Sequence, residues 1–224
     1  MQIKNRIKKI LIDYNPLVIL RRKHMRSAIK NKTATFLCPN CIGGILFHDL
    51  DLQFRSPTVN TMMIQSDFVK FVLNLEDYLN QELVFFRHPE LNCPCAKLGD
   101  ITIHFTHYQT QQEAEQKWRE RSARIDRNNL FIFLSERDGL TREDFLRLGS
   151  VSARGLVIFT ANEYADIPYT VQIKKYSRDG FVGNILAMSY LTGQREYEKY
   201  FDFVEWFNRA VGGNFDITPF VKRQ

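Results

Sequence analysis

Two histidines and one aspartate lie close together in the stretch Leu98–Tyr108, LGDITIHFTHY. Its apolar and polar residues alternate, which predicts a strand with one face buried in the core. Asp100 and His104 would share the opposite face, and a bend near Thr106 would bring His107 beside them. A carboxylate next to an imidazole is a combination that general acid–base catalysis uses. The alternative is an ordinary half-buried strand that carries two polar histidines.

Cys41 is the residue that such an imidazole would activate. It lies in the motif CPNCIGG, residues 38–44, directly after a predicted buried strand at residues 34–37. A helix that begins here would place its N-terminal amides and its dipole near the thiol and lower the pKa of Cys41. The same amides would receive an oxyanion, and Gly43 and Gly44 would let a substrate approach the backbone closely. We therefore interpret Cys41 as a candidate nucleophile, with a structural cysteine as the alternative.

A nucleophilic cysteine needs a base, and the base needs a group that orients it. We expect His104 to be the base, with His107 as the second choice. Asp100 would orient the imidazole, or Asp138 would do so from the end of a later predicted strand. The chain order of cysteine, histidine and aspartate is acceptable, because geometry and not chain position defines such a site.

The four cysteines also allow a metal site. Cys38 and Cys41 form a C-x-x-C pair, and Cys93 and Cys95 form a C-x-C pair. Four thiolates from two loops would hold a tetrahedral zinc ion. The one-residue spacing of the second pair is uncommon in such sites. We therefore favour a site without a metal and keep structural zinc as an alternative.

Arg121 is a candidate for binding an anionic group. It lies one helical turn from Trp118 in the predicted helix, near its inward face. A partly buried arginine beside an aromatic ring would clamp a phosphate or a carboxylate of the substrate. The alternative is an ion pair with an internal acid such as Asp100.

The elements that must position these residues alternate between strands and helices, which predicts an α/β fold. We expect a single mixed sheet flanked by helices in residues 33–224, preceded by a basic N-terminal helical arm at 1–32. Besides the central stretch, the predicted strands are 34–37, 59–63, 83–86, 129–134, 155–160 and 169–174. The predicted helices are 67–79, 110–124, a short one from Thr141, 181–191 and 196–211.

The net charge of +6 is unevenly distributed. Residues 1–32 carry +9, so the remaining 192 residues carry −3. A nucleic-acid-binding surface spread over the whole domain is therefore not expected. The arm combines apolar and basic residues and would lie on an anionic membrane, or it would dock on the body with its lysines solvated. No apolar run approaches the roughly 20 residues of a membrane span, and we predict no signal peptide and a cytoplasmic location, peripheral at the inner membrane face.

Three segments of the chain, ATFLCPNCIGGILFHDLDLQFRSPTVN, KLGDITIHFTHY and EAEQKWRERSARI, resemble a bacterial family catalogued as domain of unknown function 1919. The resemblance runs from about Thr33 to Phe207. The family's first motif is an Asn-Cys-Trp-Gly-Gly run, in which Ile42 replaces the tryptophan here. The residues of this chain that match the family pattern are Asn40, Cys41, Gly43, Gly44, the Ser56-Pro57 turn, Asp100, His104, His107, Trp118 and Arg121. The other three cysteines lie outside the pattern, which argues against zinc.

Members of this family are often labelled exopolysaccharide-biosynthesis proteins, so the resemblance implies a role in making or decorating surface polysaccharide. We predict a transferase that moves an acyl group, such as acetyl from acetyl-CoA, to a saccharide or lipid-linked saccharide through a thioester on Cys41. Asn40, Gly43, Gly44, Trp118 and Arg121 would bind the substrate. The alternatives are a papain-like cysteine hydrolase and a non-catalytic assembly protein that docks to a membrane-bound complex through the arm.

Overall fold

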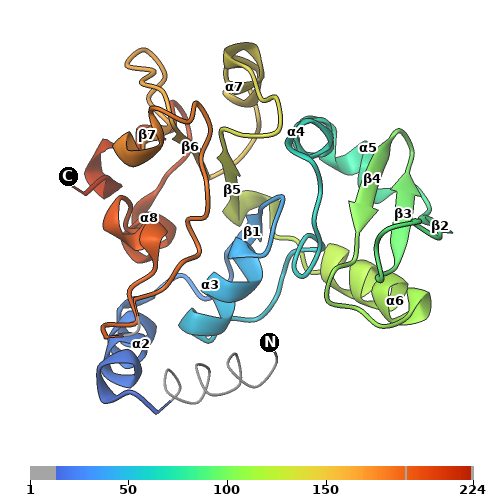
Figure 1. Ribbon diagram of the computed structural model, residues 1–224, viewed down its shortest axis with the longest axis horizontal. Helices are drawn as coiled ribbons and strands as arrows, with labels where there is room; N and C mark the ends of the chain where they lie inside the picture. Colours follow the sequence, from blue (N-terminus) through green and yellow to red (C-terminus); the bar gives the residue numbers. More distant parts are fainter. Residues whose placement is uncertain (1–13, 190, 223–224) are drawn as a thin grey trace.

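A parallel sheet of four short strands runs through the centre of the fold (Figure 1). The computed structural model describes residues 14–189 and 191–222. The strands are β1 (Thr35–Leu37), β5 (Leu130–Ser135), β6 (Gly155–Thr160) and β7 (Thr170–Gln172), in the order β1-β5-β6-β7. Every residue of β5 and β6 is buried, which is the pattern of parallel strands covered by helices on both faces.

A second sheet is antiparallel and lies on the far side of β1 from β7 (Figure 1). Its strands are β2 (Val84–Phe86), β3 (Cys95–Leu98) and β4 (Ile101–His104), in chain order. A tight turn at Gly99 and Asp100 joins β3 to β4, and Gly99 has the positive φ of 59° that such turns favour. Asp100 therefore lies in a turn and not on the strand face where the alternation placed it.

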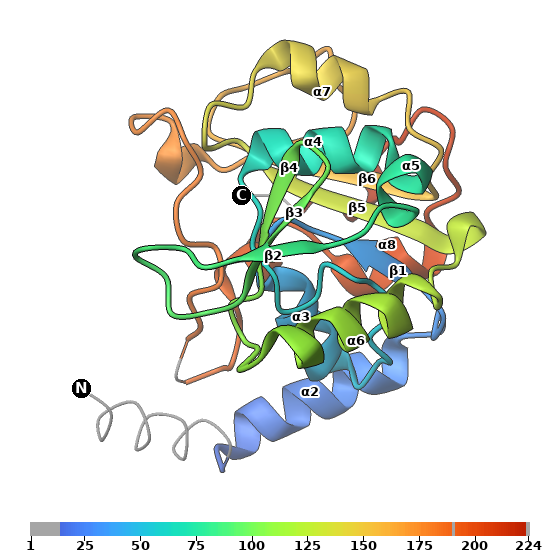
Figure 2. The same ribbon diagram turned by 90° about the vertical axis from the view of Figure 1, so that its right-hand side faces the viewer.

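Helices cover both sides of the sheets (Figure 2). They are α2 (Pro16–Ala28), α3 (Ile42–Leu50), α4 (Gln65–Leu73), α5 (Leu75–Leu79), α6 (Gln111–Ser122), α7 (Arg142–Leu148) and α8 (Phe203–Arg209). Short 3₁₀ helices are η1 (Arg127–Asn129), η2 (Lys174–Tyr176), η3 (Glu196–Lys199) and η4 (Thr218–Phe220). In Figure 2, α4 and α7 lie above the sheets, whereas α3, α6 and α2 lie below them.

The core divides into two clusters because side chains alternate along each strand. Phe131 and Phe133 of β5 belong to the cluster that includes residues of α3 and α8, such as Phe47 and Trp206. Ile132 belongs to the other cluster, with residues of α4, α7, β3 and β4. The second cluster therefore joins the antiparallel sheet to one face of the parallel sheet.

A short extended segment connects the two sheets. The backbone of Met62 pairs with that of His104 at the end of β4, with N–O distances of 2.8 and 2.9 Å. The neighbouring Met63 N–H donates to the carbonyl of Pro39, just after β1, at 2.9 Å. Of the strand predicted at 59–63, only an isolated bridge at Met62 forms, because residues 59 and 60 lie in a turn. The segment fixes the end of β4 beside the end of β1.

The structure confirms the α/β class, with its parallel and antiparallel pairing divided between two sheets. Predicted strands at 34–37, 83–86, 129–134, 155–160 and 169–174 correspond to β1, β2, β5, β6 and β7. The helix predicted at 181–191 is wrong, because residues 181–189 contain no helix. The one predicted at 196–211 is broken at Asp202, whose side chain accepts from Glu205 N–H at 3.1 Å and caps α8.

Part of the predicted basic helical arm is described by the structure. Residues 1–13 of the arm lie outside the described residues. Pro16 occupies the first turn of α2, where its missing N–H costs nothing. None of the helices in residues 14–189 and 191–222 combines the length and apolar content that a membrane crossing needs.

Candidate functional site

Cys41 lies at the carboxyl end of β1, immediately before α3. This is the edge of a parallel α/β sheet where ligands usually bind. Its backbone is helical, with φ of −68° and ψ of −5°, and it occupies the N-cap position of α3. The residue is half-buried. Helix α3 therefore begins where the motif predicted it, with the thiol at its N-terminal end.

The first amides of α3 are held by the residues that precede Cys41. Ile42 N–H donates to Asn40 Oδ1 at 3.0 Å, and Gly43 N–H donates to the sulfur of Cys38 at 3.2 Å. Cys38 is fully buried, and burial raises the pKa of its thiol to about 12. Cys38 and Asn40 therefore fix the start of the helix, and the substrate-binding role of Asn40 stays a prediction.

Gly43 and Gly44 are buried, and they do not line an open backbone surface as the motif suggested. A Cβ atom on Gly43 would lie 2.6 Å from the sulfur of Cys38. A Cβ atom on Gly44 would lie 3.1 Å from Asn60 Oδ1. The two glycines are therefore required for close packing of α3 against its neighbours, not for approach of a substrate.

His107 is the imidazole that faces Cys41. Its Nε2 lies 3.3 Å from the sulfur of Cys41, within hydrogen-bonding distance for sulfur. The ring is exposed, and it follows β4 in a turn closed by Tyr108 N–H donating to the carbonyl of Phe105 at 3.1 Å. The bend expected near Thr106 is thus the feature that brings the second-choice histidine to the thiol.

The environment of Cys41 favours a protonated thiol. Burial raises the pKa of Cys41 above its ordinary value, and a hydrogen bond with the Thr106 side chain acts in the opposite direction without cancelling it. The expectation that the N-terminus of α3 would lower this pKa is therefore wrong. A nucleophilic role for Cys41 would therefore need a base that takes the thiol proton, and the imidazole in contact with its sulfur is that of His107.

His104, the first-choice base, has a different partner. Its Nδ1 lies 3.5 Å from the sulfur of Cys95, which is the residue directly opposite it on β3. The ring of His88 packs edge-on against it, with centroids 5.7 Å apart. Burial, and then the charge of His88, lowers the pKa of His104. The geometry thus places His104 in a cross-strand pair and not beside Cys41.

Neither predicted aspartate orients His107. Asp100 accepts hydrogen bonds from Lys70 Nζ at 2.7 Å and from the Tyr78 hydroxyl at 2.5 Å. These two bonds lower the pKa of Asp100, and the bond from Lys70 has the larger effect. Asp138 is exposed in the loop after β5, and its partner is Arg137 at 3.4 Å. Within the described part of the chain, the site is therefore a pair of cysteine and histidine without an aspartate.

Arg121 and Trp118 support the site from within the core. Arg121 is only 7% exposed, and its Nη1 donates to the carbonyl of Val59 at 2.9 Å and to the Tyr108 hydroxyl at 2.5 Å. Trp118 packs against core rings, including that of Phe105 at 6.1 Å. Neither the predicted anion clamp nor the alternative ion pair with Asp100 is formed. Arg121 instead ties the loop before Asn60 to the residue that follows His107.

Two residues near the pair were missed by the sequence analysis. Thr106 bonds to the thiol of Cys41, and its hydroxyl donates to the carbonyl of Asn60 at 3.4 Å. Asn60 has a positive φ of 66°, a conformation that asparagine adopts more readily than most residues. Asn60 lies ahead of the predicted helix at 67–79, and an asparagine at this place was the signal in the sequence for a turn.

The four cysteines do not assemble into a zinc site. All are free thiols, and the described residues contain no group of three or more potential ligands arranged to hold a metal ion. Cys38 donates to the carbonyl of Asn40 at 3.2 Å, whereas Cys95 contacts His104 on the antiparallel sheet. The two pairs of cysteines therefore serve separate parts of the fold.

Comparison with known proteins finds a relative and a family that cover most of this chain. An uncharacterized protein of Haemophilus influenzae is 36% identical over 186 residues, which is 83% of this chain and 89% of that protein. The DUF1919 domain, a domain of unknown function, matches residues 17–208. The match includes Cys41, His107, and all but the first residue of α2 and the last residue of α8. This chain is therefore a member of the DUF1919 family.

Proposed function

We propose that this protein is an acyltransferase acting on a precursor of surface polysaccharide, with Cys41 as the nucleophile and His107 as the general base. The observation that carries the proposal is the 3.3 Å separation between Cys41 Sγ and His107 Nε2. Cys41 is half-buried and His107 is exposed, so both residues border the solvent. The choice of a saccharide rests on the resemblance to proteins labelled for exopolysaccharide biosynthesis.

The first half of the reaction would form a thioester. As the sulfur of Cys41 attacks the carbonyl carbon of an acyl thioester donor, His107 Nε2 takes the thiol proton. The tetrahedral intermediate then collapses, the bond from carbonyl carbon to the donor's sulfur breaks, and the departing thiolate takes the proton from His107. The acyl group is left on Cys41. Because the pKa of Cys41 is raised, the transfer of its thiol proton to His107 would be the step that most needs catalysis.

The second half would return the site to its starting state. A hydroxyl group of the saccharide attacks the thioester carbonyl while His107 accepts the hydroxyl proton. The bond between the acyl carbon and the Cys41 sulfur breaks, and the sulfur takes that proton back. The products are an ester on the saccharide and a free thiol, so neither an oxidant nor a reductant is needed.

The N-terminus of α3 would stabilise the oxyanion in both halves. The amides of Ile42 and Gly43 are already bonded to Asn40 and Cys38. Among the residues that the structure describes, the amide of Cys41 has no such acceptor. A carbonyl under attack by the sulfur would lie close to this amide, because both belong to one residue.

Hydrolysis is the second candidate function, favoured by the exposure of His107 to solvent. In that case water would take the place of the saccharide hydroxyl and the same pair would act as a papain-like hydrolase. A lipid-linked acceptor would favour a location at a membrane surface, which we include in the proposal. A non-catalytic assembly role would need the arm and not Cys41.

The test is to incubate the protein with acetyl-CoA or with p-nitrophenyl acetate and to measure its intact mass. We expect one acetyl adduct, mapped to Cys41 by fragmentation and missing from Cys41→Ser. Adding a saccharide acceptor should discharge the adduct with formation of an acetylated saccharide, whereas discharge to free acetate alone would favour the hydrolase. If neither donor acylates Cys41, the enzymatic proposal is refuted.

A further inference from the structure

Helix α2 directs its arginines toward the protein body. Arg21 Nη2 lies 3.0 Å from Glu198, and Arg22 Nε lies 3.2 Å from the buried carboxylate of Asp49. Arg26 Nε donates to the backbone carbonyl of Asp49 at 2.9 Å. A surface helix usually buries aliphatic side chains and exposes charged ones. Here the guanidinium groups anchor the inner face, so the outer face has a different composition.

The outer face carries large apolar side chains. Leu17, Ile19 and Leu20 are 57%, 49% and 61% exposed. Tyr14 is 78% exposed just before the helix, and Leu191 is 76% exposed on a loop whose carbonyl accepts from Asn15 Nδ2 at 3.2 Å. We call these five residues the α2 patch: Tyr14, Leu17, Ile19, Leu20 and Leu191. Clustered apolar exposure of this kind marks an interaction surface.

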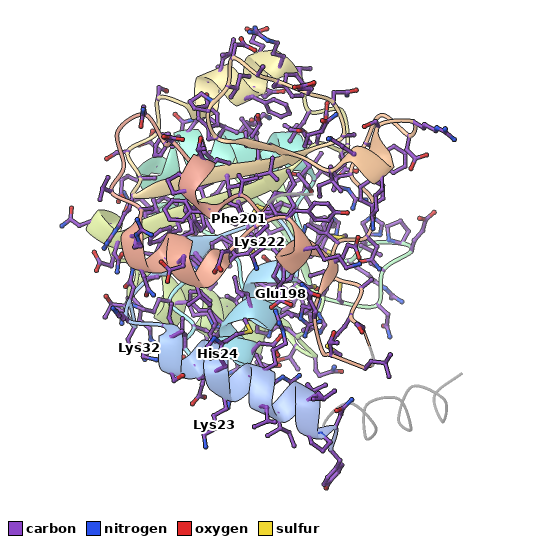
Figure 3. The ribbon with its side chains drawn as sticks, turned by 90° about the vertical axis from the view of Figure 1, so that its left-hand side faces the viewer. Lys23, His24, Lys32, Glu198, Phe201 and Lys222 are labelled. Atoms are coloured by element: carbon purple, nitrogen blue, oxygen red, sulfur yellow. The ribbon has the colours of Figure 1, made fainter. Side chains whose placement is uncertain are left out.

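The surroundings of the α2 patch are cationic. The sequence contains no aspartate or glutamate from residue 14 to residue 48. Lys23 and Lys30 are exposed, and neither contacts a carboxylate within the described ranges. Figure 3 shows Lys23 projecting from α2 away from the body, with Lys32 near the end of the helix. A partner for this face must therefore accept both aliphatic side chains and unpaired lysines.

We propose that the α2 patch docks on an anionic lipid surface, with α2 lying in the plane of the interface. Leu17, Leu20 and their neighbours would enter the boundary between headgroups and acyl chains, and Lys23 and Lys30 would meet the lipid phosphates. This assignment names the contact face for the membrane location in the proposed function, and its chemistry does not involve Cys41. Lipid is favoured over a second copy of the chain, because two copies would bring like charges together.

The cavity behind α2 does not compete with this assignment. It has a volume of about 270 Å³, and its lining includes Arg21, His24, Glu198 and Lys222 (Figure 3). Its cations are matched by acids, as in the pair of Arg21 and Glu198 and in the pair of Lys222 Nζ and Asp202 Oδ2 at 3.8 Å. The unmatched positive charge lies on the outer side of the helix.

The test is flotation of the full chain with vesicles of phosphatidylcholine, with and without phosphatidylglycerol. We expect binding to the anionic vesicles that weakens as salt is raised. The double variant Leu17→Ser/Leu20→Ser and the variant Lys23→Glu should each lose at least about tenfold in affinity for the anionic vesicles. The matched controls Val84→Ser and Lys97→Glu change exposed residues on the antiparallel sheet and should bind as the unaltered protein does.

The proposal is overturned if the protein fails to bind anionic vesicles, or if it binds neutral ones equally well. It is also overturned if the α2 variants bind like the controls, or if they alter the oligomeric state and leave vesicle binding intact. Because all the substituted side chains are exposed, the variants should keep their fold, which thermal unfolding checks. Cys41→Ser should bind vesicles normally, so failure of the reaction and failure of the docking face give separate results.

Discussion

Two pairs of cysteine and histidine occur in this protein, and they differ in what surrounds them. Cys41 and His107 lie 3.3 Å apart, and Cys95 and His104 lie 3.5 Å apart. Cys95 is fully buried in a sheet, whereas Cys41 is half-buried and His107 is exposed. Proximity of a thiol and an imidazole therefore does not by itself define a reactive site. Access of a substrate to the thiol and backbone amides near the sulfur are needed as well.

The backbone explains the difference. Cys95 and His104 are opposite residues of a hairpin, and their amides and carbonyls are engaged in or near the sheet. Cys41 instead caps a helix at the carboxyl end of a parallel strand, and His107 lies on a turn held in place through Arg121 and Tyr108. Among the residues that the structure describes, the first pair thus has the Cys41 amide beside it without an acceptor, whereas the second pair is part of the packing of the sheet.

Replacing the two cysteines should give the largest contrast. With p-nitrophenyl acetate as the acyl donor, we expect Cys41→Ser to release p-nitrophenolate at no more than about a thousandth of the rate of the unaltered protein, because the nucleophile is lost. Cys95→Ser should remain close to the unaltered protein, since Ser can still bond to His104. Stopped-flow absorbance measures both rates. Equal loss in the two variants would mean that the pairs are not functionally distinct.

Alkylation should separate the two thiols by pH. Burial raises the pKa of Cys41 above its ordinary range, and it raises that of Cys95 to about 11. A raised pKa keeps the thiol protonated at neutral pH. The rate of reaction with iodoacetamide should therefore rise about tenfold for each pH unit until the pH reaches the pKa, and it should still be rising at about pH 8.5, where an ordinary cysteine begins to level off. Peptide mass spectrometry should find Cys41 modified before Cys95. A plateau for Cys41 below neutral pH would instead reveal a preformed thiolate.

Replacing Arg121, which supports the pair of Cys41 and His107, should lower the free energy of unfolding more than replacing His104 of the second pair. Arg121→Leu removes the donor to the Tyr108 hydroxyl oxygen and one of the two donors to the Val59 carbonyl, which keeps its bond from the Tyr108 hydroxyl. The variant should lower the free energy of unfolding by about 1–3 kcal/mol. His104→Asn changes a half-buried ring and should cost about 0.5 kcal/mol. Urea unfolding measures both. If His104→Asn costs more than Arg121→Leu, the assignment of Arg121 as a support is contradicted.

Much of the fold could be predicted from local patterns. The continuous apolar runs gave β5 and β6, and Thr110 and Thr141 predicted the starts of α6 and α7 through capping. The prediction failed where tertiary contacts decide. Val182 N–H donates to the carbonyl of Glu136 at 2.7 Å, which fixes the segment after it in an irregular path in place of a helix.

The site was predictable only in part. The motif identified Cys41, and the possible bend near Thr106 kept His107 among the candidates. His104 was preferred because Asp100 was expected on the same strand face, but Asp100 lies in the turn with Gly99, and the structure places His107 and not His104 beside Cys41. A two-residue turn there places Cys95 opposite His104, and the sequence contained that signal. The approach of His107 to Cys41 depends on the link from Met63 to Pro39, which no local pattern encodes.

The measurement that tests the account most directly is the rate at which p-nitrophenyl acetate acetylates Cys41 in three proteins. These are the unaltered chain, His107→Asn and His104→Asn, each quenched at intervals and analysed by peptide mass spectrometry. We predict that His107→Asn slows acetylation about a hundredfold and that His104→Asn leaves it unchanged. Equal rates in all three, or slowing only in His104→Asn, would contradict the pairing of Cys41 with His107.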